Sequence, residues 1–341
     1  FIQTNSDQNR FNPVFSTTGN DKEVFTLARP LNIRNMAGVN ADGTPFTVAF
    51  SALNDDTRVS LDVFSFFLQD EIELSEHFDL VLGARFDSFD IEVFNAKADE
   101  NLSRKDDQVS PRAGLIYKPQ ENISVYASYS ESFLPRSGEQ YTDINGSKSQ
   151  LDPDTYSNQE IGLKWDFAQG LSFTAAVFEN EQKSPQVADE DPATLDVINS
   201  EISGFELQLS GALSEDWHVS VNYSNLDGEI VERSGPTGRT PRELPENTFS
   251  VWSTYQINDR FGIGLGATYQ DESFINNSNS AVLPSYTRVD ASAYYDISDD
   301  LRVQLNIENL TDEVYFPNAH STHQATVAAP INAMLTLVGR L

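Results

Sequence analysis

Six side chains in polar stretches of the sequence could bind an anion. Arginine and lysine donate charge-assisted hydrogen bonds, and the ring of a tyrosine can stack on a ligand or a cation. The alternative for each charge is a solvated side chain, or one paired with any of the 52 Asp and Glu residues, which contributes little stability at a surface. These candidates are Arg136, Tyr141 and Lys148 in the stretch 134–154, and Arg233, Arg239 and Arg242 in the stretch 233–244.

Two histidines are spaced closely enough to contact the same metal ion or ligand. His320 and His323 lie three positions apart, and imidazole can bind a metal or share a hydrogen bond with a ligand. However, no carboxylate or third ligand has a fixed spacing nearby, and the stretch has no helical periodicity. We therefore predict no metal site and keep both histidines as candidate ligand contacts, with loop packing as the alternative. His77 and His218 lie at or beside short turns and are predicted to be structural.

Several other kinds of chemistry are excluded. The sequence has no cysteine, so thiolate metal sites and cysteine nucleophiles are absent from it. A net charge of −30 argues against nucleic-acid binding. The glycines of Gly262-Ile263-Gly264-Leu265-Gly266 recur at period 2 with no helix after them, which indicates a smooth strand rather than a phosphate-binding loop. No Ser-His-Asp or paired-carboxylate arrangement has a catalytic context, so we predict no catalytic residue and no enzymatic activity.

The elements that must position these residues are β-strands. Apolar and polar residues alternate in repeated segments, and side chains of a strand point alternately to opposite faces. Each segment therefore has one apolar and one polar face, and the i, i+3, i+4 spacing of a helix is not observed. The clearest apolar runs are Leu80/Leu82/Ala84/Phe86, Ile123/Val125/Ala127/Tyr129, Leu171/Phe173/Ala175/Val177, Phe205/Leu207/Leu209, Trp217/Val219/Val221/Tyr223, Val289/Ala291/Ala293/Tyr295 and Leu301/Val303/Leu305/Ile307.

Short turns and long loops alternate along the chain. Short turns are expected at 75–77, 120–122, 168–170, 214–216, 258–260 and 298–300, with central residues 45, 48, 46, 44 and 40 positions apart. Longer polar stretches lie between them, at about 98–107, 134–154, 182–193, 233–244, 273–284 and 312–328, after an opening loop at about 7–57. Each repeat predicts one hairpin. This gives thirteen strands from about Thr57 to Leu341 and a fourteenth in Phe1–Ser6.

This alternation favours a membrane barrel over a soluble sandwich or propeller. A transmembrane β-barrel has short periplasmic turns, long extracellular loops and strands that are apolar outside and polar inside. Aromatic residues at strand ends, such as Phe78, Trp165 and Trp217, are typical of an interfacial girdle. No run of about 18 apolar residues predicts a transmembrane helix. We predict an all-β, antiparallel transmembrane β-barrel. Because the chain opens on Phe1 rather than Met, we expect a fragment or a processed chain.

Several segments resemble the barrel of TonB-dependent outer-membrane receptors. They are Ser110–Pro119, Val125–Phe133, Glu160–Trp165 and Gly204-Phe205-Glu206. The run Asn306–Tyr315 is similar to the family signature Asn-Leu-x-Asp-x-x-Tyr. Phe133–Gln140, followed by Leu151-Asp152-Pro153, resembles the siderophore branch of the family and its catecholate-type receptors. The resemblance covers nearly all of residues 57–341.

The resemblance implies a fold and a function. The barrel of these plugged transporters has twenty-two strands, so this chain would supply the last fourteen. Eight strands, the plug domain and the segment with the TonB box would lie outside it. The implied function is import of a ferric siderophore across the outer membrane of a Gram-negative bacterium, powered by TonB-ExbB-ExbD through the missing segment. Leu341 departs from the aromatic residue with which the family usually ends.

The resemblance also suggests roles for the candidate residues. Ferric catecholates are bulky anions, so cations and aromatics in the loops are the expected contacts. The ligand-binding candidates are Arg136, Tyr141, Arg239, Arg242, His320 and His323. We expect no covalent cofactor, the ferric siderophore being the transported ligand, and we expect outer-membrane lipid and lipopolysaccharide as further partners. The alternatives are a passive porin-like or adhesive barrel, or TonB-dependent uptake of cobalamin or a glycan.

Overall fold

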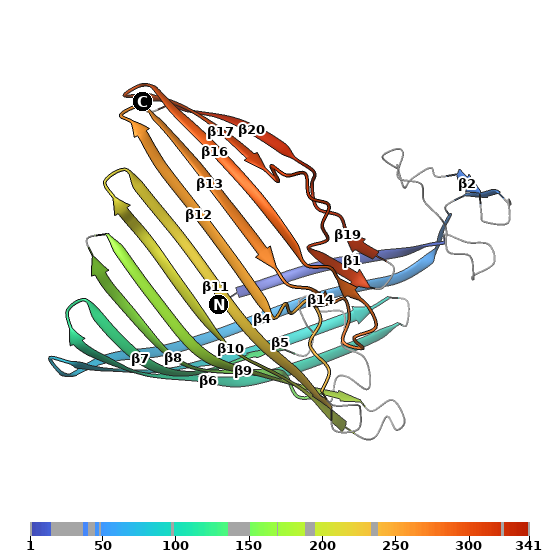
Figure 1. The fold of residues 1–341 in the computed structure, drawn as a ribbon. Helices are drawn as coiled ribbons and strands as arrows, with labels where there is room; N and C mark the ends of the chain where they lie inside the picture. The colour runs from blue at the N-terminus through green and yellow to red at the C-terminus, as the bar shows by residue number, and fades with distance from the viewer. Residues whose placement is uncertain are drawn as a thin grey trace. The chain divides into compact units, whose positions relative to one another are not determined.

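The computed structural model describes residues 2–14, 37–39, 45–47, 49–96, 99–135, 151–168, 170–187, 195–232, 238–321 and 324–339. Within them, fourteen strands form one sheet in the order β1-β4-β5-β6-β7-β8-β9-β10-β11-β12-β13-β16-β17-β20 (Figure 1). The antiparallel, all-β prediction and its fourteen strands are therefore confirmed. In this part of the chain no helix is long and apolar enough to cross a bilayer.

The strands of the sheet differ greatly in length. Their bounds are β1 Ile2–Val14, β4 Ala49–Ser75, β5 Phe78–Asn95, β6 Glu100–Gln120, β7 Ile123–Leu134, β8 Asp154–Ala168, β9 Leu171–Val187, β10 Leu195–Ser214, β11 Trp217–Glu232, β12 Asn247–Asn258, β13 Phe261–Gln270, β16 Tyr286–Ser298, β17 Leu301–Glu308 and β20 Asn332–Gly339. Three small hairpins stand apart from the sheet: β2 Ala37–Val39 with β3 Pro45–Thr47, β14 Ser273–Phe274 with β15 Val282–Leu283, and β18 Asn318–Ser321 with β19 Gln324–Thr326.

The chain divides into two compact units. The smaller comprises Phe1–Ser65, Asp87–Gln108 and Pro135–Gln150, and the larger comprises Phe66–Phe86, Val109–Leu134 and Leu151–Leu341. The smaller unit has its own apolar cluster, in which Phe89 and Leu102 pack against buried side chains. These are Val59, Leu61, Val63, Ile91 and Val93, which are at most 8% exposed.

The opening loop is shorter than the predicted range of about 7–57. Strand β1 continues to Val14 and pairs with β4 from Ile2↔Val63 to Val14↔Ala49, with register shifts on either side of Phe11. The polar loop predicted at 98–107 is likewise mostly strand, because β6 begins at Glu100. Main-chain hydrogen bonds hold a strand regardless of its side chains. Alternating hydrophobicity, by contrast, is needed only where one face meets lipid.

The six predicted short turns lie along one edge of the sheet in the larger unit (Figure 1). Each of the first five turns is hydrogen-bonded to the strand that leads into the next turn. The bonds run from the amide of Lys118 to the carbonyl of His77, Asp166 to Asn122, Ala212 to Gly170, Gln256 to Asp216 and Asp296 to Arg260, over 2.7–2.9 Å. The turns of Glu121 and Asp299 therefore share one edge, as the topology prediction requires.

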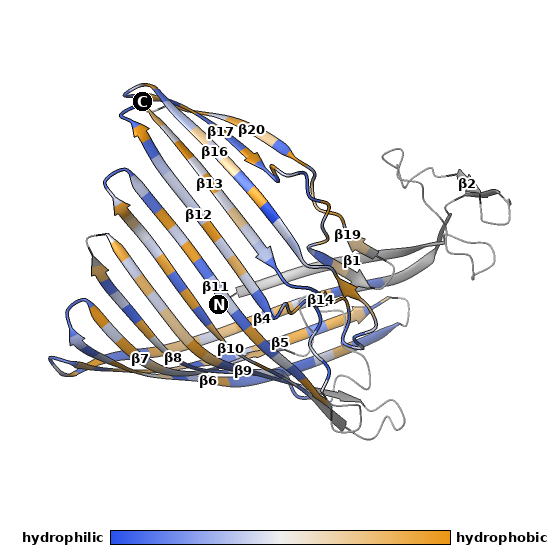
Figure 2. Cartoon of the chain, in the orientation of Figure 1, coloured by the Kyte–Doolittle hydropathy of each residue, from blue (hydrophilic) through white to orange (hydrophobic). Residues whose placement is uncertain are grey.

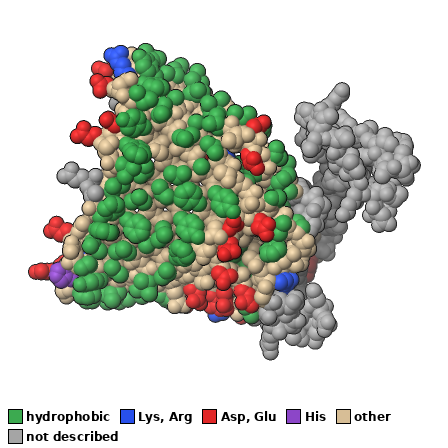
Figure 3. Space-filling model, viewed as in Figure 1, with side chains coloured by type: hydrophobic (Ala, Val, Ile, Leu, Met, Phe, Trp, Pro, Cys, Tyr) green, Lys and Arg blue, Asp and Glu red, His purple; other side chains and the backbone are tan. Residues whose placement is uncertain are grey.

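The two faces of the strands differ in the predicted way. Apolar residues on the odd positions of the last strands are exposed, including Leu305 at 36%, Leu335 at 68% and Leu337 at 66%. Figure 3 shows such side chains as a broad green area over the sheet, and Figure 2 shows the alternation along the coloured strands, such as β12 and β13. An exposed apolar surface of this extent is typical of contact with lipid. Even positions carry polar groups such as Gln304 and Asn306, although Met334 and Val338 in β20 are exceptions.

Glycines on the polar face accommodate large side chains of neighbouring strands. A Cβ at Gly162 would overlap the ring of Tyr126, and one at Gly262 would overlap the ring of Tyr294. Trp252 lies over Gly264 and Gly266 in the same way. The period-2 glycines of β13 thus provide the flat strand surface expected from the sequence, and aromatic rings cover it.

Candidate ligand-binding loops

Three loops of the larger unit are joined by hydrogen bonds at the edge opposite the short turns. They are 238–246 before β12, 271–285 between β13 and β16, and 309–331 between β17 and β20. The amide of Glu243 donates to the carbonyl of Phe274 over 2.7 Å. The side chain of Asn279 accepts from the amide of Thr240 at 2.9 Å and donates to its carbonyl at 2.8 Å. The first two loops are therefore fixed to each other by one backbone–backbone hydrogen bond and by the side chain of Asn279, which is bonded to the backbone of Thr240.

The third loop is attached through Glu243. Its carboxylate Oε1 accepts a hydrogen bond from the amide of Ala319 over 2.8 Å, and its backbone is held at a φ of 57°. Ala319 also belongs to a small apolar cluster with Ile275 and Leu283, against which Phe316 packs. A non-glycine residue in this left-handed region is uncommon, which indicates that the surrounding contacts impose the conformation.

This assembly contains three of the six predicted ligand-binding residues. The carbonyl of Arg239 accepts from the amide of Ile230 over 2.7 Å, and the amide of Arg242 donates to Oδ1 of Asn277 over 3.0 Å. The side chain of Arg242 is exposed. His320 follows Ala319 in β18, but the placement of its side chain lies outside the described part of the structure. Arg136, Tyr141, Lys148, Arg233 and His323 lie outside the described residues altogether.

A pocket of about 490 Å³ lies between the first two loops. Its apolar wall includes Leu244, Phe274 and Val282, and its carboxylates are Glu246, Asp271 and Glu272. The hydroxyl of Tyr269 and Nδ2 of Asn247 both donate to the Asp271 carboxylate, which lowers its pKa below the usual range. The pocket is therefore suited to a ligand group that is cationic or donates hydrogen bonds. Arg242, in contrast, offers a cation to an anionic group.

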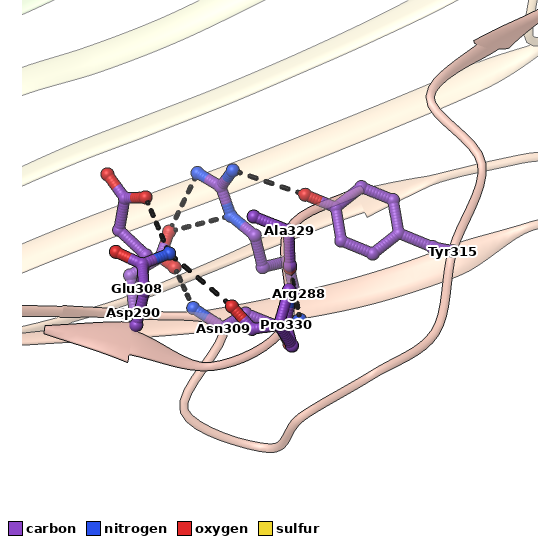
Figure 4. A network of polar contacts seen from close by, with 8 residues as sticks. Arg288, Asp290, Glu308, Asn309, Tyr315, Ala329 and Pro330 are labelled. Atoms are coloured by element: carbon purple, nitrogen blue, oxygen red, sulfur yellow. Dashed lines mark hydrogen bonds and ion pairs between the residues drawn. The ribbon is translucent and has the colours of Figure 1, made fainter. Parts of the chain in front are cut away.

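The segment that resembles the family signature forms a buried polar network (Figure 4). Asn309 is 1% exposed. Its side chain donates to the carbonyls of Glu313 and Ala329, at 2.9 and 3.2 Å, and accepts from the amide of Glu313 at 2.8 Å. Its amide donates to Asp290, which is ion-paired with Arg288. The signature therefore fixes the last loop to β16, a structural role.

Sequence reasoning missed the residues that brace the loops. The side chains of Glu243, Asn277 and Asn279 form hydrogen bonds to backbone groups of another loop. No residue type or spacing in the sequence predicts these bonds. The only available signal is the polar run Asn276–Ser280, whose composition is typical of turns. Among the described residues, no group of three or more His, Asp or Glu side chains is arranged to hold a metal ion.

Comparison with known proteins decides the family. The family model for the TonB-dependent receptor-like β-barrel matches residues 2–310. The chain belongs to the TonB-dependent receptor family. It is therefore a protein of the outer membrane of a Gram-negative bacterium, as the sequence predicted.

Individual TonB-dependent receptors are similar over most of this chain. The probable siderophore receptor PiuA of Acinetobacter baumannii is 33% identical over 304 residues, which are 83% of this chain and 41% of that protein. The probable receptor BfrD of Bordetella pertussis is 30% identical over 83% of this chain and 41% of its own length. The chain thus spans about two-fifths of the curated relatives that it matches.

Solved structures of TonB-dependent receptors share the fold. The crystal structure of PiuA superposes with a TM-score of 0.76 at 28% identity, covering 89% of this chain and 50% of that one. The ferric-catecholate import receptor Fiu of Escherichia coli gives a TM-score of 0.75 at 20% identity, covering 89% and 49%. At that identity the second comparison supports the fold alone.

Proposed function

We propose that this barrel belongs to a receptor that imports a ferric siderophore, of the catecholate type, into the periplasm. The observation that carries the proposal is the braced loop assembly, which presents the exposed Arg242 beside the strand of His320. Support also comes from a relative that is named as a siderophore receptor, PiuA. Arg136, Tyr141, Arg239 and His323 complete the proposed contacts. TonB-ExbB-ExbD would power transport through a segment outside this chain.

The pocket between the first two loops favours a second candidate ligand. Its carboxylates, Glu246, Asp271 and Glu272, suit a siderophore with a cationic amine better than an anionic tris-catecholate, because like charges repel. One relative, 29% identical over 75% of this chain, is named as the ferrioxamine B receptor of Salmonella typhimurium. The two candidates differ in the charge that the loops would accept.

An uptake experiment separates these candidates. The complete receptor is produced in an iron-starved Gram-negative host that lacks its own siderophore receptors, and uptake of radioactive iron is measured. We expect uptake from ferric enterobactin, a tris-catecholate, to exceed uptake from ferrioxamine B, and to stop when TonB is deleted. The reverse preference would favour the amine-bearing ligand. Iron uptake that persists without TonB would reject the receptor function in favour of a passive barrel.

A further inference from the structure

The pocket between the first two loops carries negative charge only. Its volume of about 490 Å³ is typical of small-molecule sites. Every charged residue of its lining is acidic, namely Glu246, Asp271 and Glu272. Glu246 and Glu272 are exposed, and within the described part of the chain neither lies within ion-pair distance of a cation. The pocket therefore attracts a positively charged group.

A buried hydroxyl in the lining has no protein partner. Ser273 lines the pocket and is only 4% exposed. Among the residues that the structure describes, its hydroxyl makes no hydrogen bond. Buried polar side chains nearly always have a partner, because a buried group without one loses the hydrogen bonds that it would make to water. A ligand group that donates a hydrogen bond in the pocket would supply this partner.

The apolar wall of the pocket is held in place by the fold. It consists of Leu244, Phe274 and Val282. Leu244 packs directly on β11 at Gly228, where a Cβ would overlap its side chain. The carbonyl of Phe274 accepts from the amide of Glu243 over 2.7 Å. Because the wall is fixed before a ligand arrives, less conformational freedom is lost on binding.

The lining favours an organic ammonium over a metal ion. Among the described residues, no group of three or more His, Asp or Glu side chains is arranged to hold a metal ion. Both carboxylate oxygens of Asp271 already accept hydrogen bonds, from Tyr269 and Asn247. An ammonium on a short alkyl chain, by contrast, brings N–H donors for the carboxylates and for Ser273. Its methylene groups would pack against the apolar wall.

We propose that this pocket binds an alkylammonium arm of the transported ligand. The proposal rests on the proposed function and narrows its ligand to a ferric siderophore that is anionic at the iron and carries a primary ammonium on a side arm. The exposed Arg242 lies two residues before Leu244 in the same loop. One braced assembly thus offers a cation to the chelate and carboxylates to the arm. Recognition of both charges discriminates against a ligand that has only one of them.

The test compares two synthetic chelators on the complete receptor. One is a tris-catecholate with an aminopentyl arm, and the other is the same compound with its amine acetylated, which removes the charge. Binding of their radioactive ferric complexes is measured on de-energised cells of a host that lacks its own siderophore receptors. We expect the wild type to bind the amine about tenfold more tightly than the acetylated form. Glu246→Gln/Glu272→Gln should bind the two within about twofold of each other and keep its affinity for the acetylated form.

Glu313→Gln is the matched control. It removes a carboxylate from an exposed position in the third loop, outside the lining of the pocket. This variant should keep the wild-type preference for the amine. Loss of the preference in Glu313→Gln would attribute the effect to the net charge of the loops and would overturn the pocket as the ammonium site.

Two further results would reject the pocket. They are equal wild-type affinities for the two complexes and a preference that persists in the double variant. If the double variant loses both complexes, Glu272→Gln alone decides, because an unchanged preference in it also rejects the pocket. If the receptor binds ferrioxamine B and no catecholate, N-acetyl ferrioxamine B replaces the acetylated compound with the same expectations. A wild-type receptor that binds no ferric siderophore would instead reject the proposed function.

Discussion

Asn309 stabilises the loop between β17 and β20 more than any single exposed cation of the loops does. Its buried side chain makes three hydrogen bonds, and its φ is 53°. Asn309→Ala should lower the free energy of unfolding by about 1–3 kcal/mol, because the buried carbonyls and amide lose their partner. The measurement is the thermal unfolding of the purified receptor in detergent. Asn332→Ala, an exposed residue of the same network, is the control, and equal losses in both variants would contradict the role given to Asn309.

Arg136 and Arg242 test the proposed ligand contacts in the loops. Loss of one charge-assisted contact costs about 1.5–3 kcal/mol, or roughly ten- to a hundredfold in affinity. Arg136→Ala and Arg242→Ala should each weaken binding of ferric enterobactin by about this factor and leave assembly intact, because an exposed loop charge carries little stability. Titration of siderophore binding on whole cells measures both. Unchanged affinity in the two variants and in Tyr141→Ala would exclude these loops as the binding site.

The stability of the folded protein should vary with pH in part through Asp271. Hydrogen bonds from Tyr269 and Asn247 lower its pKa in the folded protein. Its stabilising effect is therefore complete above the unfolded pKa of about 3.9 and is lost as the pH falls through the lower, folded pKa. Asp271→Asn should thus unfold at a lower temperature than wild type at pH 6, with a difference that shrinks below about pH 4. Glu272→Gln is the control, and a difference that grows in acid would contradict the mechanism.

Among the elements, β9, β10 and β11 bring three glutamates together in one row. Glu201 is directly opposite both Glu181 and Glu229, on the same face as the apolar Phe205. Like charges in this position destabilise a sheet by roughly 0.2–1 kcal/mol per pair, although Lys183 lies 2.9 Å from Glu181. Glu201→Gln should therefore raise the unfolding temperature, and added salt should reduce the gain by screening.

Glu206→Gln provides the matched control for this row. It removes the same charge from the same strand, but Glu206 has Ser224 and Ala176 opposite, so we expect little change in unfolding temperature. Equal gains from both substitutions would attribute the effect to net charge rather than to the cross-strand pairs.

The sequence predicts strands reliably only where contact with lipid on one face imposes an alternation of apolar and polar residues. The alternation in Leu301–Ile307 and Trp217–Tyr223 predicted β17 and β11, since one face meets lipid and the other is polar. The run Glu100–Asp107 has no such pattern and was predicted as part of a loop, yet it is strand. The small hairpins of β14–β15 and β18–β19 were missed for the same reason. Arg239 and Arg242 were identifiable as cations in a loop, but the backbone contacts of Glu243 and Asn279 that hold them were not.

At the scale of the whole molecule, the repeat of short turn and long loop was enough to predict the topology. Every short turn was placed correctly, because each follows a strand whose apolar face has a defined length. The division into two compact units was not foreseen. The smaller unit is built on the apolar cluster of Val59, Leu61, Val63, Ile91 and Val93.

The orientation of the larger unit in the membrane can be tested with single cysteines, because this chain contains none. Ser278 lies in an exposed loop at one end of the strands and Ser214 at a short turn at the other, with a hydrocarbon core of about 30 Å expected between them. A membrane-impermeant maleimide should label Ser278→Cys in intact cells, and Ser214→Cys only after the outer membrane is permeabilised. Both substitutions are nearly isosteric, so folding should be preserved, and siderophore uptake checks this. Labelling of Ser214→Cys in intact cells, with Ser278→Cys protected, would reverse the proposed orientation and place the braced loops in the periplasm, where they could not meet a siderophore arriving from outside.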